Sequence, residues 1–290
     1  MKVLIVGATG YIGTVVADHL TEAGHDVVEL SRSGDGPDRG RARRVGDLTD
    51  PSSLSAAVTP DIDAVVNLAT PTGDPDADAA AVAALTEPLR GTGRAFVYTS
   101  GVWVLGATGP EPAGEDAPTN PIPIVGYRPA IERQVINAAG HGVRSVVIRP
   151  GIVHGRGGGI PALLVDLARK HEAPRYVGAA TVRWPMVHVD DLADLFVAAL
   201  ERAPAGTLWH GVTEPAVPVH ELAAAAGDAA GVSGRPQAWP LEEARATLGE
   251  AFADALALDQ SVSGDAARRE LDWRPRHEDA VAELRAGSAK

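Results

Sequence analysis

A glycine-rich segment, residues 7–13, separates the first apolar run of the sequence from a helical stretch. Gly7 can take a turn conformation that is closed to other residues, Gly10 lets the backbone approach a pyrophosphate, and Gly13 permits close packing of helix on strand. The pyrophosphate then lies at the positive end of the helix. The segment therefore predicts a dinucleotide site whose contacts come from Gly7, Thr9, Gly10, Tyr11, Ile12 and Gly13.

The second apolar run, residues 26–30, ends in Ser31 and Arg32, where NAD-binding proteins usually carry an acidic residue for the ribose 2′-hydroxyl. A carboxylate there would repel a 2′-phosphate, whereas a hydroxyl and a guanidinium can donate hydrogen bonds to it. We therefore predict NADP as the cofactor, with NAD the less favoured alternative. A solvated loop is expected for the arginines that follow, Arg39, Arg41, Arg43 and Arg44.

The elements that position these residues alternate between short apolar runs and helical stretches. This alternation predicts a Rossmann-type, doubly wound α/β fold, with a parallel sheet of about six strands and helices on both faces. Strands are expected at residues 3–6, 26–30, 64–67, 95–98 and 145–148, and helices at 12–23, 50–57 and near 121–139. Two loops rich in Gly, Pro and Asp, residues 70–78 and 106–123, follow strands and therefore lie at the ligand-binding edge of the sheet.

The pattern changes after about residue 160. Helices are expected near residues 160–170, 190–202, 218–230, 241–256 and 264–271. We therefore predict an NAD(P)-binding domain over residues 1–160, joined by a returning strand near 207–210, and a smaller, mainly helical substrate-binding domain over residues 161–290.

Composition narrows the classes of partner and site. The 290 residues carry a formal net charge of −12, so neither nucleic acid nor an anionic membrane is an expected partner. The sequence has no cysteine, which excludes disulfides, thiolate metal sites and a cysteine nucleophile. We find no metal-ligand spacing among its histidines and acids. With no signal peptide and no apolar run of membrane-spanning length, a cytoplasmic protein is expected.

Five further segments carry motifs, at residues 46–48, 67–69, 149–155, 187–193 and 270–275. Together with residues 7–13 they resemble the extended short-chain dehydrogenase/reductase superfamily, which includes NAD(P)-dependent nucleotide-sugar epimerases and dehydratases. The resemblance implies that Asp47 and Leu48 lie against the adenine and that Leu68 and Ala69 line the cofactor. It also implies a cofactor contact for Pro150, in the segment after the sixth strand.

The catalytic positions of that superfamily are altered here. Its members use a serine or threonine, a tyrosine as acid/base, and a lysine four residues later that lowers the pKa of the tyrosine. The hydroxyl position falls on Gly101, with Ser100 one residue away. In one register Ile124 and Arg128 replace the tyrosine and lysine; in the other Tyr127 is the tyrosine and an isoleucine replaces the lysine. We prefer the first register, because Arg128 can still hydrogen-bond a ribose.

Several residues are candidates for the missing chemistry. Ser100, Tyr127 and Arg128 are our catalytic candidates, with Arg128 also contacting the cofactor. His154 and His188 are possible replacement acids because histidine titrates near neutral pH, although each is more often a scaffold residue. Asp190 and Asp191 are expected to cap the helix that follows them.

The resulting functional hypothesis is an NADP-dependent oxidoreductase or epimerase-like enzyme that acts on a small polar carbonyl or sugar-like substrate. One alternative is a non-catalytic NADP sensor or regulator. Another is a non-redox enzyme built on the same fold. A catalyst should hold a polar group within reach of a substrate carbonyl, whereas a sensor should have an apolar or closed space there. The resemblance also makes a homodimer possible.

Overall fold

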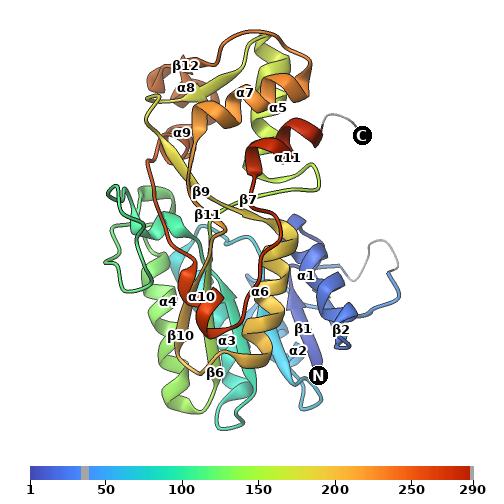
Figure 1. The fold of residues 1–290 in the computed structure, drawn as a ribbon. Coiled ribbons are helices and arrows are strands. Elements are labelled where there is room, and N and C mark those ends of the chain that lie inside the picture. Colours follow the sequence, from blue (N-terminus) through green and yellow to red (C-terminus); the bar gives the residue numbers. More distant parts are fainter. Residues whose placement is uncertain (34–38, 288–290) are drawn as a thin grey trace.

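A parallel sheet of seven strands forms the core of the larger lobe (Figure 1). The computed structural model describes residues 1–33 and 39–287. The spatial order of the strands is β10-β6-β5-β4-β1-β2-β3, and every pairing is parallel. Their bounds are β1 Lys2–Val6, β2 Asp26–Ser31, β3 Ala42–Val45, β4 Ala64–Asn67, β5 Ala95–Thr99, β6 Arg144–Pro150 and β10 Thr207–Gly211. The predicted doubly wound α/β fold is therefore confirmed, and the strand order reverses between β1 and β4, where such folds bind ligands.

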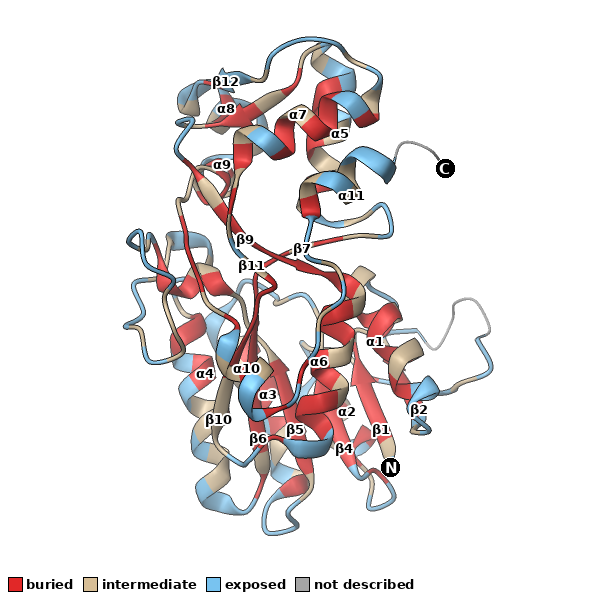
Figure 2. Cartoon of the chain, in the orientation of Figure 1, coloured by how far each residue is buried: buried red, intermediate tan, exposed pale blue. Residues whose placement is uncertain are grey.

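Helices cover both faces of this sheet because alternate strand residues point to opposite sides. Val3 and Ile5 of β1 pack with α1 and α6, whereas Leu4 and Val6 pack with α2, α3 and α4. Both faces are buried along β1, β4 and β5 (Figure 2). The bounds of these helices are α1 Tyr11–Glu22, α2 Pro51–Ala57, α3 Pro75–Thr86, α4 Arg128–Asn137 and α6 Val189–Arg202.

The smaller lobe contains two short sheets with helices against them (Figure 1). One sheet has the order β11-β9-β7 and the other pairs β12 with β8. The strands are β7 Ile152–His154, β8 Arg175–Val177, β9 Arg183–His188, β11 Glu214–Pro218 and β12 Gln237–Trp239. The helices of this lobe are α5 Gly159–His171, α7 Val219–Ala230, α8 Leu241–Leu248, α9 Glu250–Leu256 and α11 Ala280–Ala286. Helix α10, Asp265–Glu270, packs beside β10 of the larger lobe. The domain division at residue 160 stays a prediction, because the chain crosses between the lobes several times.

Three local expectations were wrong. The helix expected near 121–139 starts only at Arg128, because prolines at 121 and 123 leave a 3₁₀ turn, Pro123–Val125, before it. The helix expected at 241–256 is divided at Gly249, whose φ of +86° ends α8. The expected arginine loop instead contains β3. Arg43 of β3 and Arg41, the residue just before it, both form ion pairs with Glu29 of β2. Sequence patterns missed β3 because it is not apolar.

Candidate active site

The glycine turn after β1 is packed against the loop after β4. Gly7 has a φ of +85°, and a Cβ there would lie 2.7 Å from backbone atoms of Ala69. A Cβ on Gly13 would lie 2.0 Å from the carbonyl oxygen of Gly7. Both positions therefore exclude any larger residue. The structure thus brings the predicted cofactor segments, residues 7–13 and 68–69, together at the point where the strand order reverses.

Gly10 has a different role in the same turn. It is exposed, as is Thr9, and a Cβ there would meet only the Gly7 carbonyl oxygen, at 3.4 Å. Gly10 is the N-cap residue of α1 and provides no side-chain hydrogen bond to the helix. The start of α1 therefore leaves backbone N–H groups accessible beside a turn that carries no side chains at its glycines. This arrangement fits a dinucleotide pyrophosphate.

The predicted 2′-phosphate residues lie at the carboxyl end of β2. Ser31 is half-buried and Arg32 is exposed there. Asp47 is nearby, and hydrogen bonds from the backbone and hydroxyl of Thr49, with a smaller contribution from Arg32, lower the pKa of its carboxyl group. Leu48 packs on the α2 side of the sheet. Arg32 is therefore available to a 2′-phosphate.

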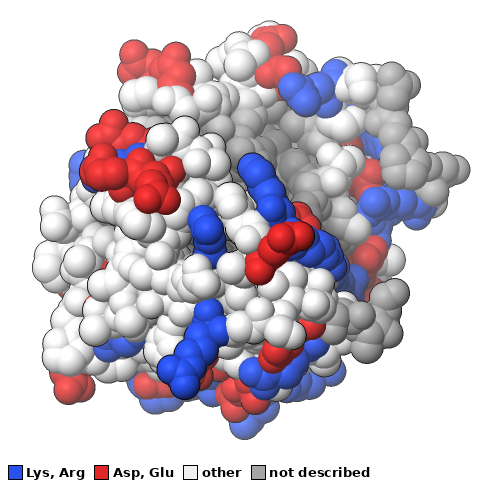
Figure 3. All heavy atoms as spheres, turned by 90° about the horizontal axis from the view of Figure 1, so that it is seen from above, with Lys and Arg blue, Asp and Glu red and all other residues white. Residues whose placement is uncertain are grey.

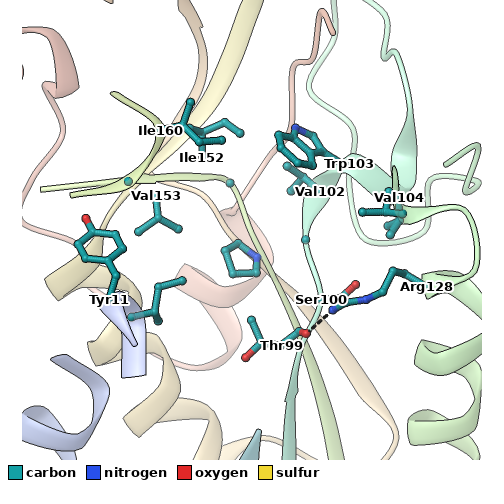
Figure 4. A pocket seen from close by; sticks show the side chains of 16 residues that line it. Tyr11, Thr99, Ser100, Val102, Trp103, Val104, Arg128, Ile152, Val153 and Ile160 are labelled. Atoms are coloured by element: carbon teal, nitrogen blue, oxygen red, sulfur yellow. Dashed lines mark hydrogen bonds between the residues drawn. The ribbon is translucent and has the colours of Figure 1, made fainter. Parts of the chain in front are cut away.

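A cavity of about 300 Å³ opens beside the glycine turn of residues 7–13, between the two lobes (Figure 4). Tyr11, Ile12 and Pro150 line it on the side of the predicted cofactor site. The rest of its lining includes six apolar residues: Val102, Trp103, Val104, Val125, Ile152 and Ile160. Two of the three predicted catalytic residues, Ser100 and Arg128, thus share a single space with four predicted cofactor residues, Tyr11, Ile12, Pro150 and Arg128 itself.

Ser100 continues the line of β5 into the cavity. Its N–H donates to the carbonyl oxygen of Ile148, 2.7 Å away, so the chain stays paired to β6 at this point. The hydroxyl groups of Thr99 and Ser100 are buried and have no hydrogen-bond partner in the structure. Buried polar groups are rarely left unsatisfied, so these two hydroxyls mark a place that a ligand can complete.

Arg128 is the first residue of α4 and is 7% exposed. One terminal guanidinium nitrogen donates to the carbonyl oxygen of Thr99 at 2.5 Å, and the guanidinium carbon lies 5.2 Å from the centre of the Tyr98 ring. Its Nε has no partner. Figure 4 shows the side chain reaching toward Thr99 and Ser100. A fixed cation and two free hydroxyls therefore meet at the carboxyl end of β5.

A buried network holds α4 in the position that places Arg128. One turn after Arg128, the Glu132 carboxylate accepts hydrogen bonds from Arg149 Nε and Nη2 at 2.9 and 2.6 Å. Arg149 also approaches His210 Nε2 at 3.5 Å, and His210 Nδ1 is 3.2 Å from the carbonyl oxygen of Ser263. Burial and the charge of Arg149 lower the pKa of His210 to about 4. The network ties α4 to β6 and β10, and sequence patterns missed it because its members are distant in sequence.

Tyr127 does not line the cavity. Its hydroxyl donates to Asp78 Oδ2 at 2.5 Å, and Asp78 also accepts from the backbone and hydroxyl of Thr72. Burial, followed by the Asp78 contact, raises the pKa of Tyr127 to about 12. A raised pKa is the opposite of the shift that an acid/base tyrosine needs. Asp78 lies in α3, a helix that was not predicted although Asp74 and Pro75 form its cap and first turn.

The two candidate histidines form a separate cluster with Glu283 of α11. His188 Nε2 lies 2.8 Å and His154 Nδ1 lies 3.1 Å from oxygens of Glu283. Burial opposes ionisation of Glu283, yet its contacts with the two histidines lower its pKa to about 2. Neither histidine lines the cavity. His154 and His188 are therefore placed to hold the lobes and α11 together.

The expectation that Asp190 and Asp191 cap α6 was wrong. His188 is the N-cap residue, and its Nδ1 accepts from the Asp190 N–H at 3.2 Å. The Asp190 carboxylate pairs with Arg156 and His19. Asp191 is fully buried and accepts from backbone N–H groups at residues 276 and 277. Because β9 enters the helix with a histidine, the cap lies before the acidic pair rather than on it.

Further observations bear on metals, membranes and charge. His188, Asp190 and His277 form one group with metal-like spacing, but each already has a protein partner. Within residues 1–33 and 39–287, no helix is both long and apolar enough to cross a membrane. On the face seen in Figure 3, acidic and basic side chains are interspersed, with no continuous basic surface among the residues described.

Known proteins are similar to this chain in sequence and in fold. The family model described as the NAD dependent epimerase/dehydratase family matches residues 3–209. An uncharacterized protein of Schizosaccharomyces pombe, C2A9.02, is 32% identical over 98% of both chains. A 3-diazoavenalumate denitrifying reductase of a Streptomyces species is 30% identical, over 96% of this chain and 97% of its own. The crystal structure of human epimerase family protein SDR39U1 with NADPH superposes with a TM-score of 0.79 at 24% identity, with full coverage of both chains.

Proposed function

The chain belongs to the NAD-dependent epimerase/dehydratase family, and we propose that it is an NADP-dependent oxidoreductase that interconverts a small carbonyl compound and its alcohol. The observation that carries this proposal is the open cavity beside the glycine turn. Ser100 and Arg128 line it, and their Oγ and Nε atoms are buried there without a hydrogen-bond partner. A protein that only senses NADP could use Arg128 to bind the ribose, but it has no need of the additional unsatisfied hydroxyl of Ser100.

Each group in the site has a separate task. The glycine turn and the start of α1 hold the pyrophosphate. The rest of the cofactor lies against Pro150, Leu68 and Ala69. A bound nicotinamide supplies or accepts the hydride. Ser100 and Arg128 donate hydrogen bonds to the carbonyl oxygen, which stabilises the negative charge that develops there during reduction. The proton for that oxygen comes from water by way of the Ser100 hydroxyl, because a guanidinium keeps its proton.

NADP is preferred over NAD because of charge. Arg32 is exposed at the end of β2 and no acidic residue occupies the ribose position in the adjoining residues 31–33. The solved SDR39U1 structure contains NADPH, which supports the same assignment here. The Streptomyces relative is named as a reductase, which supports the redox reaction. The cytoplasmic location and the homodimer expected from the sequence stay predictions, which cell fractionation and light scattering would test.

A non-catalytic NADP sensor is the second candidate. It is favoured by Ile124, which stands at the tyrosine position of our preferred register and is 39% exposed, and by the raised pKa of Tyr127. Such a protein would bind NADPH and oxidise none of it. Turnover, rather than binding, therefore separates the two functions.

The cofactor site is tested by titrating the protein with NADPH and NADH in a calorimeter. Gly10→Asp adds a carboxylate without a clash and is expected to abolish NADPH binding, because it repels the pyrophosphate. Gly140→Asp, where a Cβ meets nothing within 4 Å, is its control. Arg32→Ala should weaken NADPH about tenfold and NADH little, whereas Arg274→Ala, at an 82% exposed side chain, should alter neither. Equal loss of both nucleotides in Arg32→Ala would contradict the NADP assignment.

The catalytic groups are tested by NADPH oxidation with a panel of carbonyl compounds. Ser100→Ala is expected to lower kcat about 100-fold while NADPH binding changes less than about twofold. Arg128→Lys should recover part of the activity that Arg128→Gln loses, because a cation is kept. Wild-type protein that binds NADPH but oxidises none with any carbonyl would favour the sensor.

A further inference from the structure

The substrate side of the cavity is apolar. Six neighbouring residues form it: Val102, Trp103, Val104, Val125, Ile152 and Ile160. Figure 4 shows Trp103, Ile152 and Ile160 arranged around the upper part of the space, with Ser100 and Arg128 below them. A hydroxyl-rich molecule placed there would lose its hydrogen bonds to water, and the Trp103 indole N–H is the one donor that these six side chains offer in return. The wall is therefore matched to hydrocarbon.

The polar groups of the cavity are few and lie at one end. Among the described residues that line it, Arg128 alone carries a formal charge. Thr99 and Ser100 lie beside Arg128, while the Tyr11 hydroxyl already donates to the Gly155 carbonyl oxygen at 2.7 Å. This end can bind one carbonyl oxygen. Among the described side chains at the other end of the cavity, the Trp103 indole N–H is the one polar group, and none is charged.

A sugar diphosphate is poorly matched to this cavity for a quantitative reason. Its two phosphates carry about two negative charges, and Arg128 is partly committed to Thr99 and to the Tyr98 ring. The first turn of α5, at Gly159 and Ile160, also lines the cavity, but a helix N-terminus offers only about half a charge. The chain as a whole carries −12 and adds no attraction for an anion.

From this arrangement we infer that the substrate is an uncharged, largely hydrocarbon ketone or aldehyde, with its carbonyl between Ser100 and Arg128 and its hydrocarbon part against Trp103, Ile152 and Ile160. The inference rests on the proposed function and replaces the polar or sugar-like substrate expected from the sequence. In the reducing direction the carbonyl carbon gains a hydride from NADPH and the oxygen gains a proton from water, giving an alcohol and NADP⁺.

The test compares binding and turnover across one homologous series. Straight-chain methyl ketones from butanone to octanone are titrated by calorimetry into the protein saturated with NADPH, and NADPH oxidation is followed in parallel. Each added methylene should tighten binding about fourfold until the cavity is filled. Dihydroxyacetone, glyceraldehyde and UDP-glucose should bind at least tenfold more weakly than hexanone. Equal or tighter binding of these polar compounds, or no dependence on chain length, would overturn the inference.

Two matched variants test which residues contact the hydrocarbon chain of the ketone. Ile160→Ala shortens a half-buried side chain in the cavity wall, and Ile136→Ala shortens a half-buried isoleucine of α4 that does not line the cavity. Octanone binding should weaken about tenfold in Ile160→Ala and stay unchanged in Ile136→Ala. Equal effects of both variants would contradict the assigned wall.

The two readouts separate this inference from the proposed function. Length-dependent ketone binding without NADPH oxidation would support the apolar substrate site and refute the oxidoreductase. NADPH oxidation that is faster with polar carbonyls than with ketones of equal size would support the oxidoreductase and refute the apolar substrate.

Discussion

The glycine turn and the cavity beside it are built in different ways. The turn, our predicted cofactor site, depends on backbone: Gly7 and Gly10 precede α1, Gly13 lies in its first turn, and Gly7 packs against the backbone at Ala69. The polar end of the cavity depends on side chains from distant elements, with Arg128 on α4 and Ser100 after β5. A site made of backbone atoms is determined by a short local segment of the sequence. A side-chain site requires that whole helices be held in register, here by the buried pair of Glu132 and Arg149.

The largest expected change in the free energy of unfolding comes from removing the buried ion pair that holds α4. Glu132→Ala leaves Arg149 buried without its carboxylate and should lower the free energy of unfolding by about 3–5 kcal/mol. Urea denaturation followed by circular dichroism measures this change. Glu87→Ala, which removes an exposed partner of Arg90, should have little effect. If both variants unfold like the wild type, the buried pair does not support α4.

His210 makes the same region sensitive to acid. Its pKa is about 4 in the folded protein and about 6.5 when unfolded, so folding disfavours its charged form. The stabilisation is complete above pH 6.5 and is lost as the pH falls toward 4, by at most about 3 kcal/mol. Unfolding free energies measured at intervals from pH 7 to about 4 should fall less steeply in His210→Gln than in the wild type. Parallel curves would show that His210 does not carry this dependence.

In the glycine turn, steric clashes rather than charge should decide how much a substitution lowers stability. Gly13→Ala places a methyl group 2.0 Å from the Gly7 carbonyl oxygen and should cost about 1–3 kcal/mol, with loss of NADPH affinity. Gly10→Ala meets the same oxygen only at 3.4 Å and should leave the melting temperature almost unchanged. Thermal denaturation with and without NADPH compares the two variants. Similar destabilisation by both would mean that the turn is looser than its contacts indicate.

The smallest effect is expected at Tyr127. Tyr127→Phe removes a half-buried hydrogen bond to Asp78 and should cost about 1 kcal/mol. NADPH turnover should change less than about twofold, because the hydroxyl contacts Asp78 and lies outside the cavity lining. A loss of kcat of about 100-fold with unchanged stability would instead make Tyr127 the acid/base.

Local sequence was enough to predict the doubly wound fold and the glycine turn, because each depends on residues close in the chain. The assignment of residues 7–13 and 68–69 to the cofactor stays a prediction. Apolar alternation identified strands buried on both faces, and the glycine spacing is a local steric requirement. The strand β3 was not predicted because it is polar and its arginines form ion pairs. The late start of α4 was not predicted because prolines before it interrupt the helix.

Tertiary packing decided which side chains meet. It placed Ser100 and Arg128, which are 28 positions apart, in one cavity, and directed Tyr127 toward Asp78 and His154 and His188 toward Glu283. It also formed the apolar wall from segments on both lobes, near residues 102–104, 125, 152 and 160. The physical reason is that burial and hydrogen-bond partners depend on how helices pack on the sheet, which is a long-range property that local sequence patterns do not contain.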